Sequence, residues 1–585
     1  MGEPHDTHDC DVLVIGAGGA GLRAAIAAAE SGASTTVVSK SLLGKAHTVM
    51  AEGGIAAALG GVDAEDDWET HFADTMLGGQ MINNWRMVDI YAREVIERVH
   101  ELERWGGLFD RTDVGRILQR AFGAHSWRRL CHVGDRTGLE LIRTLQDRVV
   151  ASDGVRIHME HTVTTLLREG ETIAGALAYR RGDGGFVVYR AGAVVLAGGG
   201  WGRMYRHTSN SWEGVGDGAA LALEAGAELI DMEFVQFHPT GMMWPPGARG
   251  ILVTEAVRGE GGHLYNAEGR RFMADHDPEK LELSSRDVVA RAIHREVEEG
   301  RGSPHGGAFL DIRHRGPEHI RRTLPSMCEQ FEALASVDIT REPMEVGPTI
   351  HYTMGGVRVD PETAATRVAG LYAAGEVAGG LHGANRLGGN SLGDILVFGR
   401  RAGLAAAEWA TARRRGRGRH DAQAVAAGQA SMLAPLDTSP RVEPPESPHR
   451  LHEALQDVMQ EDAGIARTGV SLQRSLELIG ELAERSRRLS VSGGRTFNPG
   501  WQACRDLACM LIVSEAIVRS ALARTESRGA HWRLDYPQRD DADMHNNVVA
   551  LDTVMSVTAV AVEPMPAEIR SRLSRSRLAP GGEHR

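Results

Sequence analysis

The sequence predicts an α/β protein in which a doubly wound, Rossmann-like domain is interrupted by an inserted α+β domain and followed by a C-terminal helical domain. A short apolar run near the N-terminus ends in glycines and precedes an alanine-rich stretch, and a second strand and glycine turn of this kind appears far downstream. Leucine and isoleucine then recur at helical spacing from Leu472 onward. A chain of 585 residues is too long for one hydrophobic core, which also favours several domains.

The N-terminal region predicts a strand, a tight turn, a helix and a second strand. Residues 11–15 form a short apolar run, residues 20–31 have good helix propensity, and residues 34–39 are rich in β-branched side chains. Residues 173–179 and 186–190 flank four turn-forming residues and predict a hairpin, and residues 193–197 predict another buried strand. Residues 371–375 predict a strand and glycine turn, followed by a helix from Ser391.

If the two glycine-ended regions build one domain, the stretch between them is an insertion. We therefore expect a nucleotide-binding domain in two parts, 1–235 and 351–412, with a capping domain at 236–350. A linker and helical domain follow at 413–540, and a C-terminal segment at 541–585. Five arginines at 413–419 and the proline-rich stretch 435–448 predict a solvated linker rather than a binding patch.

Composition argues against several classes of function. The formal net charge of −13 is not that of a nucleic-acid-binding protein. The five cysteines include no Cys-x-x-Cys pair suited to a metal, a cluster or a redox dithiol, so reduced thiols in a cytosolic protein are the simplest interpretation. We find no run of about 18 apolar residues and no apolar signal segment, so we expect neither a membrane span nor export.

Gly16, Gly18 and Gly21 form a G-x-G-x-x-G pattern between a predicted strand and a predicted helix. In that context the first glycine permits the turn, the second lets the backbone approach a pyrophosphate, and the third permits close helix packing. Ser39 and Lys40 follow the second strand where an NAD site would place an acid, which disfavours NAD. Glu376, after the downstream strand, fits a ribose acceptor in an FAD site, although a strand-terminal acid facing water is the alternative.

Several longer segments are similar to one enzyme family. Residues 46–54 resemble the segment of succinate dehydrogenases and fumarate reductases in which a histidine is bonded to a ring methyl of the flavin. Further matches follow in order at 236–241, 254–260, 286–287, 351–356, 382–391 and 524–537. Because these matches span residues 11 to 540 almost throughout, the chain resembles the flavoprotein subunit of that family.

The resemblance implies FAD bonded covalently to His47. It assigns further cofactor contacts to Gly16, Gly18, Gly21, Ser39, Lys40, Gly53, Gly54, Asp217, Glu376, Asn390, Ser391 and Leu392. Alkylation by histidine makes the flavin ring more electron-poor, which helps it to accept a hydride from a poor donor such as succinate.

The resemblance also implies a dicarboxylate site. It assigns His351 and Arg386 to one carboxylate of succinate or fumarate, and His238 and Thr254 to the other. Phe122 would pack over the substrate, with an ordinary core role as the alternative. Arg286 is implied as the base, with Glu255 and Arg258 as a proton relay. Because arginine normally stays protonated, such a base requires a dry site.

Partners and direction follow from the resemblance alone. It implies two partners, a membrane anchor that reduces quinone and an iron–sulfur subunit, which would hold this chain peripherally on the cytoplasmic face of the membrane. Ala46 and Glu52 replace the Ser and Gln of many succinate dehydrogenases, and Glu52, Tyr352 and Thr353 match the fumarate reductase branch. A menaquinone-linked bacterial enzyme is therefore favoured, with succinate oxidation as the first hypothesis and menaquinol-linked fumarate reduction as the alternative.

Two other hypotheses compete with this assignment. Aspartate oxidases and soluble fumarate reductases share much of the site but lack the histidyl link. A non-catalytic dinucleotide-binding module would need no paired dicarboxylate clamps.

Overall fold

The computed structural model describes residues 3–413, 421–437 and 444–578, and its first elements lie where the sequence predicts them. Strand β1 (His5–Ile15) is followed by α1 (Gly19–Glu30) and β2 (Thr35–Ser39). β1 begins at His5 rather than at residue 11, because its polar first half pairs in parallel with β9 (Phe186–Leu196) from His5 onward. The start of this strand is thus set by a distant neighbour.

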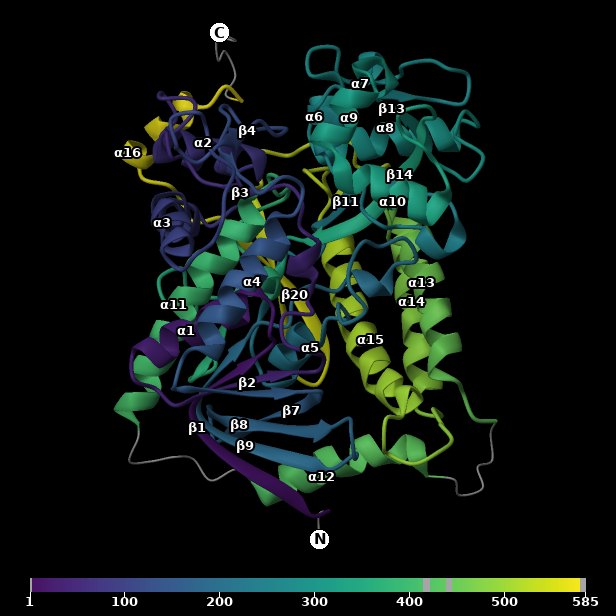
Figure 1. Cartoon of the computed structure of the whole chain (residues 1–585). Coiled ribbons are helices and arrows are strands. Elements are labelled where there is room, and N and C mark those ends of the chain that lie inside the picture. Colours follow the sequence, from purple (N-terminus) through teal and green to yellow (C-terminus); the bar gives the residue numbers. More distant parts are fainter. Residues whose placement is uncertain (1–2, 414–420, 438–443, 579–585) are drawn as a thin grey trace.

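A seven-stranded sheet forms the base of the molecule (Figure 1). Its order is β6 (Val155–Met159), β2, β1, β9, β8 (Thr172–Arg180) and β7 (His161–Glu169), and β16 (Leu371–Ala373) also pairs with β9. The pairs between β6, β2, β1, β9 and β16 are parallel, whereas β7, β8 and β9 pair antiparallel. The predicted hairpin at 173–190 is therefore confirmed.

The two strands predicted at 186–190 and 193–197 are one continuous strand, so that prediction was wrong. The first half of β9 pairs with β8, and Val194 to Leu196 pair with β16 on the same side. The change of partner occurs around Gly192, where an added Cβ would lie 2.9 Å from the Ala410 Cβ. A glycine at this point marks close packing against a helix instead of a turn.

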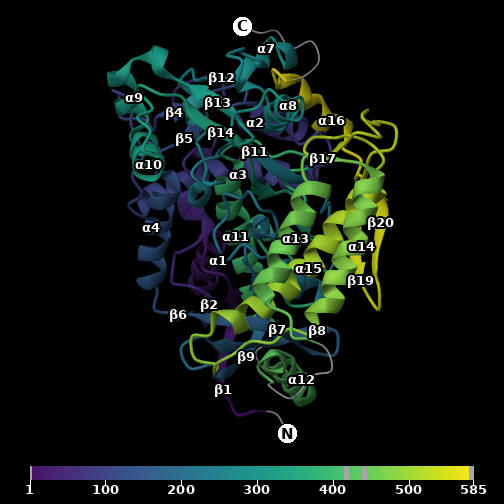
Figure 2. The ribbon, with the colours of Figure 1, turned by 90° about the vertical axis from the view of Figure 1, so that its right-hand side faces the viewer.

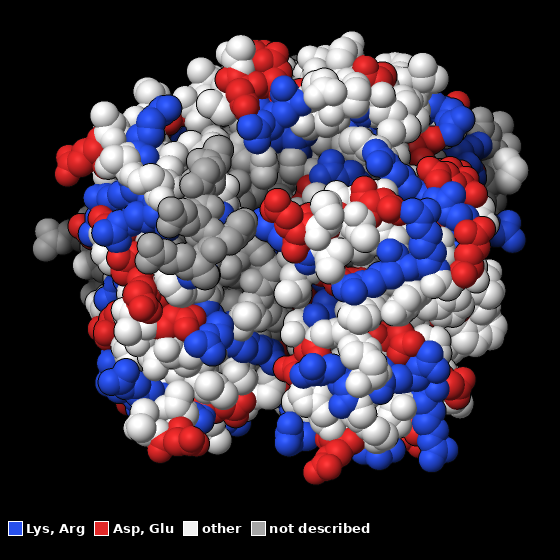
Figure 3. Space-filling model, turned by 90° about the horizontal axis from the view of Figure 1, so that it is seen from above, with Lys and Arg blue, Asp and Glu red and all other residues white. Residues whose placement is uncertain are grey.

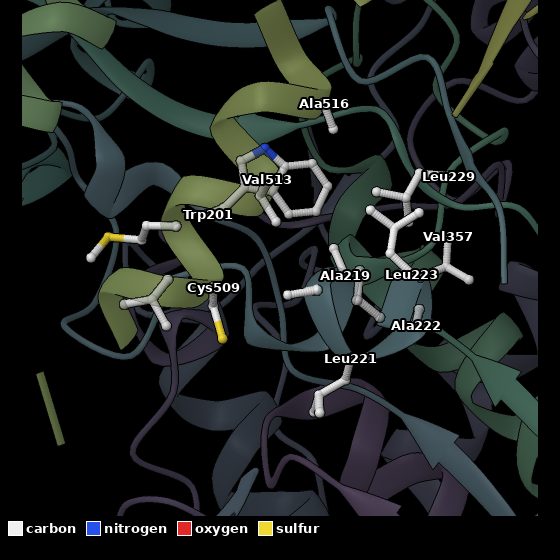
Figure 4. Close-up of a cluster of buried hydrophobic side chains, with 14 of the residues drawn as sticks. Trp201, Ala219, Leu221, Ala222, Leu223, Leu229, Val357, Cys509, Val513 and Ala516 are labelled. Atoms are coloured by element: carbon white, nitrogen blue, oxygen red, sulfur yellow. The ribbon is translucent and has the colours of Figure 1, made fainter. Parts of the chain in front are cut away.

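Both faces of the large sheet are covered, as its apolar strands require. Val12 and Val14 lie in one hydrophobic cluster with residues of α1 and α11 (Asn390–Ala412). Leu13 lies in another cluster, which includes residues of α5 (Asp217–Glu224) and α15 (Pro499–Ala523). Figure 4 shows this second cluster, in which Trp201, Leu223 and Val513 lie close together. The C-terminal helices are therefore packed onto the nucleotide-binding sheet.

A second, four-stranded sheet is inserted in the chain between β9 and β16. Its order is β11 (Val235–Met242), β14 (Met344–Thr353), β13 (Ala308–Asp311) and β12 (His263–Tyr265). It is accompanied by α6 (Ala256–Gly259), α7 (Met273–His276), α8 (Arg286–Glu298), α9 (Pro317–Thr323) and α10 (Pro325–Ala335). The predicted domain limits at 236 and 350 fall inside β11 and β14, and the division into domains stays a prediction.

The C-terminal helices α13 (Pro448–Asp462), α14 (Gly469–Ser486) and α15 run side by side (Figure 2). Leu472, Ile479 and Leu482 are buried, as their helical spacing predicts. In the described residues, none of the helices combines the length and the apolar composition needed to cross a bilayer.

The region predicted as a solvated linker contains a packed helix, α12 (Ala422–Leu433). Val425 and Met432 are buried there against Leu177 of the large sheet, so the expectation of an unstructured linker was wrong at this point. Of the predicted basic run, only Arg413 lies within the described residues, and residues 438–443 of the proline-rich stretch also lie outside them.

The last segment of the chain returns to the body of the protein. β19 (His545–Leu551) and β20 (Met555–Ala561) form a hairpin that continues a sheet with β10 (Leu229–Ile230) and β15 (Gly356–Val357). α16 (Ala567–Arg570) and η8 (Ser571–Arg575) then lie beside α2 (Trp68–Gly78) and α3 (Trp85–Arg104) (Figure 1). On the face seen in Figure 3, acidic and basic side chains are interspersed.

Candidate active site

An elongated cavity lies at the carboxyl ends of β1, β2 and β16, where doubly wound sheets bind ligands. Its volume is about 1350 Å³, including the part that is open to solvent. Nine of the predicted cofactor residues line it: Gly16, Gly18, Ser39, Lys40, His47, Asp217, Glu376, Ser391 and Leu392. His351 and Tyr352 also line it, so the cavity reaches the predicted substrate residues.

The glycine pattern fits a dinucleotide at this cavity. Gly16 has a φ of +115°, and a Cβ there would lie 2.2 Å from the Ala197 carbonyl oxygen. A Cβ at Gly21 would lie 1.9 Å from the Gly16 carbonyl oxygen, so the first turn of α1 packs directly on the strand end. Gly18 is the N-cap of α1, which leaves the positive helix end free to face a pyrophosphate.

Charged residues mark the end of the cavity beyond β2. The Lys40 ammonium pairs with Asp217 at 3.0 Å and with Asp506 of α15 at 3.2 Å. Burial lowers the pKa of Lys40, but the two carboxylates outweigh it and raise the pKa above its ordinary value. Glu376 accepts a hydrogen bond from the backbone N–H of Thr353 at 3.1 Å, and burial raises its pKa to about 7. The Glu376 carboxyl is thus well suited to accept a hydrogen bond from a ribose hydroxyl.

Three histidines lie in a row at the opposite end. The ring centroids of His47 and His351 are 5.7 Å apart, and those of His351 and His238 are 5.4 Å apart. Burial, followed by the charge of Arg386, lowers the pKa of His47 to about 4. Burial and nearby arginines lower the pKa values of His238 and His351 well below their ordinary range. His47 Nδ1 is buried without a hydrogen-bond partner in the described structure. At neutral pH these imidazoles are uncharged, which is the nucleophilic form.

Two guanidinium groups converge on one amide oxygen beside these histidines. Arg286 Nη1 and Arg386 Nη2 each donate to Gln236 Oε1 at 3.1 Å. Burial and the charge of Arg286 lower the pKa of Arg386 to about 9, and its guanidinium lies 4.2 Å from the ring centroid of Tyr352. The predicted site did not include Gln236, although it lies in the quoted segment 236–241, two residues before His238.

The predicted proton relay is assembled. Arg286 Nε donates to Glu255 Oε2 at 2.9 Å, and Arg258 Nη2 lies 3.6 Å from the same oxygen. Burial raises the pKa of Glu255, but Arg286 and Arg258 outweigh it, so the pKa lies below its usual value. The second oxygen of Glu255 accepts from the Gly123 backbone N–H at 3.0 Å. A buried carboxylate therefore links two buried guanidiniums.

Thr254, Glu52 and Phe122 complete the surroundings of the site. Thr254 is buried, and its side chain hydrogen-bonds Glu52. Burial, reinforced by Asp135, raises the pKa of Glu52 to about 8. Cβ atoms built at Gly53 and Gly388 would lie 3.0 Å and 2.4 Å from the Phe122 ring, so this ring fits between two glycine segments near Arg386. Glu52 entered the sequence argument only as a marker of the fumarate reductase branch.

Four predicted cofactor residues are not among those that line the cavity: Gly21, Gly53, Gly54 and Asn390. The Asn390 side-chain oxygen accepts from the Tyr91 hydroxyl at 3.2 Å and lies 3.1 Å from His71 Nε2. This amide holds α11 against α2 and α3. Direct contact of these four residues with a cofactor stays a prediction.

Comparison with known proteins identifies the family. Residues 11–392 match the FAD binding domain family, and residues 452–573 match the family described as fumarate reductase flavoprotein C-term. The flavin-dependent chain named for the CoM/CoB fumarate reductase of Methanothermobacter marburgensis is 46% identical over 534 residues, which cover 91% of this chain and 95% of the relative. The succinate dehydrogenase flavoprotein subunit of Rickettsia bellii is 37% identical over 590 residues, with 96% and 97% covered.

A solved structure agrees. Mycobacterium smegmatis Sdh1 in complex with UQ1 superimposes with a TM-score of 0.87 and 52% identity, over 96% of this chain and 95% of that chain. The predicted family and fold class are thereby confirmed: the chain belongs to the succinate dehydrogenase and fumarate reductase flavoproteins, which are FAD-dependent oxidoreductases.

Proposed function

We propose that this flavoprotein oxidises succinate to fumarate and that its FAD is bonded covalently to His47. The convergence of His47, His351, His238 and Arg386 at one end of the cavity carries the proposal. These groups offer hydrogen-bond donors and one strong positive charge to a small dicarboxylate beside a flavin. When bound, FAD supplies an electron-poor ring that accepts a hydride.

The substrate would be held at both ends. Arg386 and His351 would bind one carboxylate, and His238 with Thr254 would bind the other. Neutral imidazoles donate one hydrogen bond each, so Arg386 supplies the main electrostatic attraction. Its guanidinium is buried against Tyr352 and loses only hydrogen bonds to Ser391 and Gln236 when it turns toward an anion. Phe122 would exclude water from the same end of the site.

Removal of the second hydrogen requires a base close to the substrate. We assign this role to Arg286, with Glu255 and Arg258 passing the proton toward solvent. Arg286 lies close to Arg386, and a buried site that places two guanidiniums side by side disfavours the doubly protonated state. The Glu255 carboxylate, 2.9 Å from Arg286 Nε, provides the next proton acceptor. The relay thus combines a destabilised cation with an adjacent anion.

Electrons would leave the flavin through an iron–sulfur subunit, then through a membrane anchor that binds quinone, and these partners would hold this chain on the cytoplasmic face of the membrane. Fumarate reduction is the second candidate direction. It is favoured by Glu52 and by the 46% identity to the fumarate reductase of M. marburgensis. The printed name of that relative refers to CoM/CoB and that of the M. smegmatis structure to UQ1. We assign menaquinone as the physiological carrier on the strength of the branch-specific residues.

Mass spectrometry of the tryptic peptide 46–86 tests the covalent link. This peptide contains two histidines, His47 and His71. We expect the added mass of FAD after acid precipitation, with fragmentation placing it on His47. The His47→Ser variant is the matched control, because His71 remains in its peptide. Release of all flavin by acid would contradict the proposal and favour an aspartate oxidase or a soluble fumarate reductase.

Ligand-difference spectra test the dicarboxylate site. Succinate should bleach the flavin absorbance near neutral pH, and malonate should shift it without reduction. Arg386→Gln should abolish both effects, since it removes the main positive charge offered to the substrate. A flavin spectrum that neither acid changes would favour a non-catalytic dinucleotide-binding module.

A further inference from the structure

Residues 571–578, here called the C-terminal strap, lie against α2 and the segment that follows Phe122 (Figure 1). Arg572 pairs with Asp89 at 2.9 Å and with Glu69 at 3.2 Å, and Arg575 pairs with Glu69 at 3.1 Å. Leu573 packs against the hydrophobic cluster of α1 and α11. The strap is therefore attached both by charge and by apolar contact.

One buried hydroxyl group of the strap reaches deeper. Ser576 is 2% exposed and donates to Asp74 Oδ1 at 2.5 Å. The fully buried Asp74 also accepts from the Ser126 hydroxyl at 2.6 Å and from the Ser126 backbone N–H at 2.8 Å, and pairs with Arg129 at 2.9 Å. Ser576 thus completes the hydrogen-bond shell of a buried charge, which is costly to leave unfilled.

The strap also binds the same serine directly. The Arg577 backbone N–H donates to Ser126 Oγ at 2.9 Å, and the Arg577 guanidinium lies 3.9 Å from the ring centroid of Trp127. Ser126 is therefore fixed from two directions, by Asp74 beneath it and by the strap.

The segment fixed in this way, residues 122–126, touches the catalytic residues at three points. The Gly123 N–H donates to Glu255 at 3.0 Å. The His125 ring donates through Nε2 to the Gly388 carbonyl oxygen at 2.7 Å, and Phe122 lies between Gly53 and Gly388. We call residues 122–126 the active-site loop.

We propose that Ser576 is a positioning residue, through which the C-terminal strap holds the active-site loop over the substrate site. The proposal rests on the proposed function, because the loop closes that site. Loss of the Ser576 hydroxyl leaves Asp74 short of one donor and loosens Ser126. The loop then spends more time away from Glu255 and Gly388, so substrate binding weakens while the hydride and proton-transfer groups stay in place.

Ser576→Ala tests this in the full-length enzyme with its flavin. We expect the KM for succinate to rise about tenfold, equivalent to about 1.4 kcal/mol, with kcat changed by less than about twofold. Ser574→Ala is the matched control, because the Ser574 hydroxyl donates only to the Ser571 carbonyl oxygen within the strap. Ser576→Thr keeps the hydroxyl and should restore most of the substrate affinity.

Amide hydrogen exchange gives a readout without turnover. The Gly123 and Ser126 amides, which are hydrogen-bonded to Glu255 and Asp74, should exchange faster in Ser576→Ala and unchanged in Ser574→Ala. Arg577→Ala, which weakens the strap without touching the buried hydroxyl, should move KM and exchange in the same direction by less. This variant decides the question if Ser576→Ala fails to fold.

The outcomes separate the two proposals. Unchanged exchange at the active-site loop and unchanged KM in Ser576→Ala and Arg577→Ala overturn the role of the strap. A wild-type enzyme that ignores succinate and malonate overturns the proposed function instead, and exchange at the two amides still decides the strap. A fall in kcat with unaltered KM also overturns the positioning role, because it places the defect in the chemical step.

Discussion

Gln236→Glu is the sharpest test of the arginine pair. In the wild-type enzyme one neutral amide oxygen accepts from Arg286 and Arg386, each at 3.1 Å. The variant places a negative charge at this point with little change of shape. It therefore stabilises the protonated form of both guanidiniums and raises the pKa of Arg386 from about 9.

The size of the effect follows from the two short distances. Two unit charges about 4 Å apart interact by about 4 kcal/mol at an effective dielectric constant of about 20, which corresponds to roughly three pKa units. A base that must lose its proton against this attraction becomes slower by about a thousandfold if the full energy applies. We expect a fall of about a hundredfold to a thousandfold in kcat at neutral pH, with the rate still rising at the highest accessible pH.

The assay is dye-linked succinate oxidation from about pH 6 to about pH 10, a range that brackets the raised and the ordinary titration of the site. Gln236→Met is the control of opposite sign, because it removes the acceptor and leaves the cations facing each other. Its profile should stay in place or move toward lower pH. Identical pH profiles for the two variants would refute the reasoning, since they would show that the charge at residue 236 does not act on the base.

Three further predictions address other parts of the site. His47→Ser should lose covalent flavin and should lower succinate oxidation at least tenfold more than fumarate reduction, because a non-alkylated flavin is a weaker hydride acceptor; equal losses in both assays would contradict this role. Because burial raises the pKa of Glu52 to about 8, this group stabilises the fold below about pH 4.5 and the contribution is lost as the pH rises toward 8. Glu52→Gln should therefore flatten the fall in Tm between about pH 6 and pH 8, and an unaltered slope would argue against a neutral Glu52. Lys40→Met leaves Asp217 and Asp506 without their shared cation and should reduce flavin content severalfold, measured by flavin absorbance after desalting, whereas Lys40→Arg should retain most of it.

Much of the fold was predictable because its signals are local. The strand, glycine turn and helix at the N-terminus depend on neighbouring residues, and so do the helical stripe of α14 and the β8–β9 hairpin. The errors arose where distant segments decide. The first half of β1 is polar and becomes a strand because β9 supplies its partner. β9 looked like two strands because it exchanges one neighbour for another halfway along. Similarly, α12 is ordered because Leu177 lies beneath it.

The chemistry of single residues followed the same division. The sequence by itself determined the nucleotide-binding glycines, the histidine proposed to hold the flavin and the family, because those are fixed by residue type and short spacing. Only the tertiary structure decided that Gln236 joins two guanidiniums and that the strap of Ser576 reaches a loop far earlier in the chain. Hydrogen bonds of this kind reach only a few ångströms, so they depend on which segments the fold brings together and leave no periodic signal in the sequence.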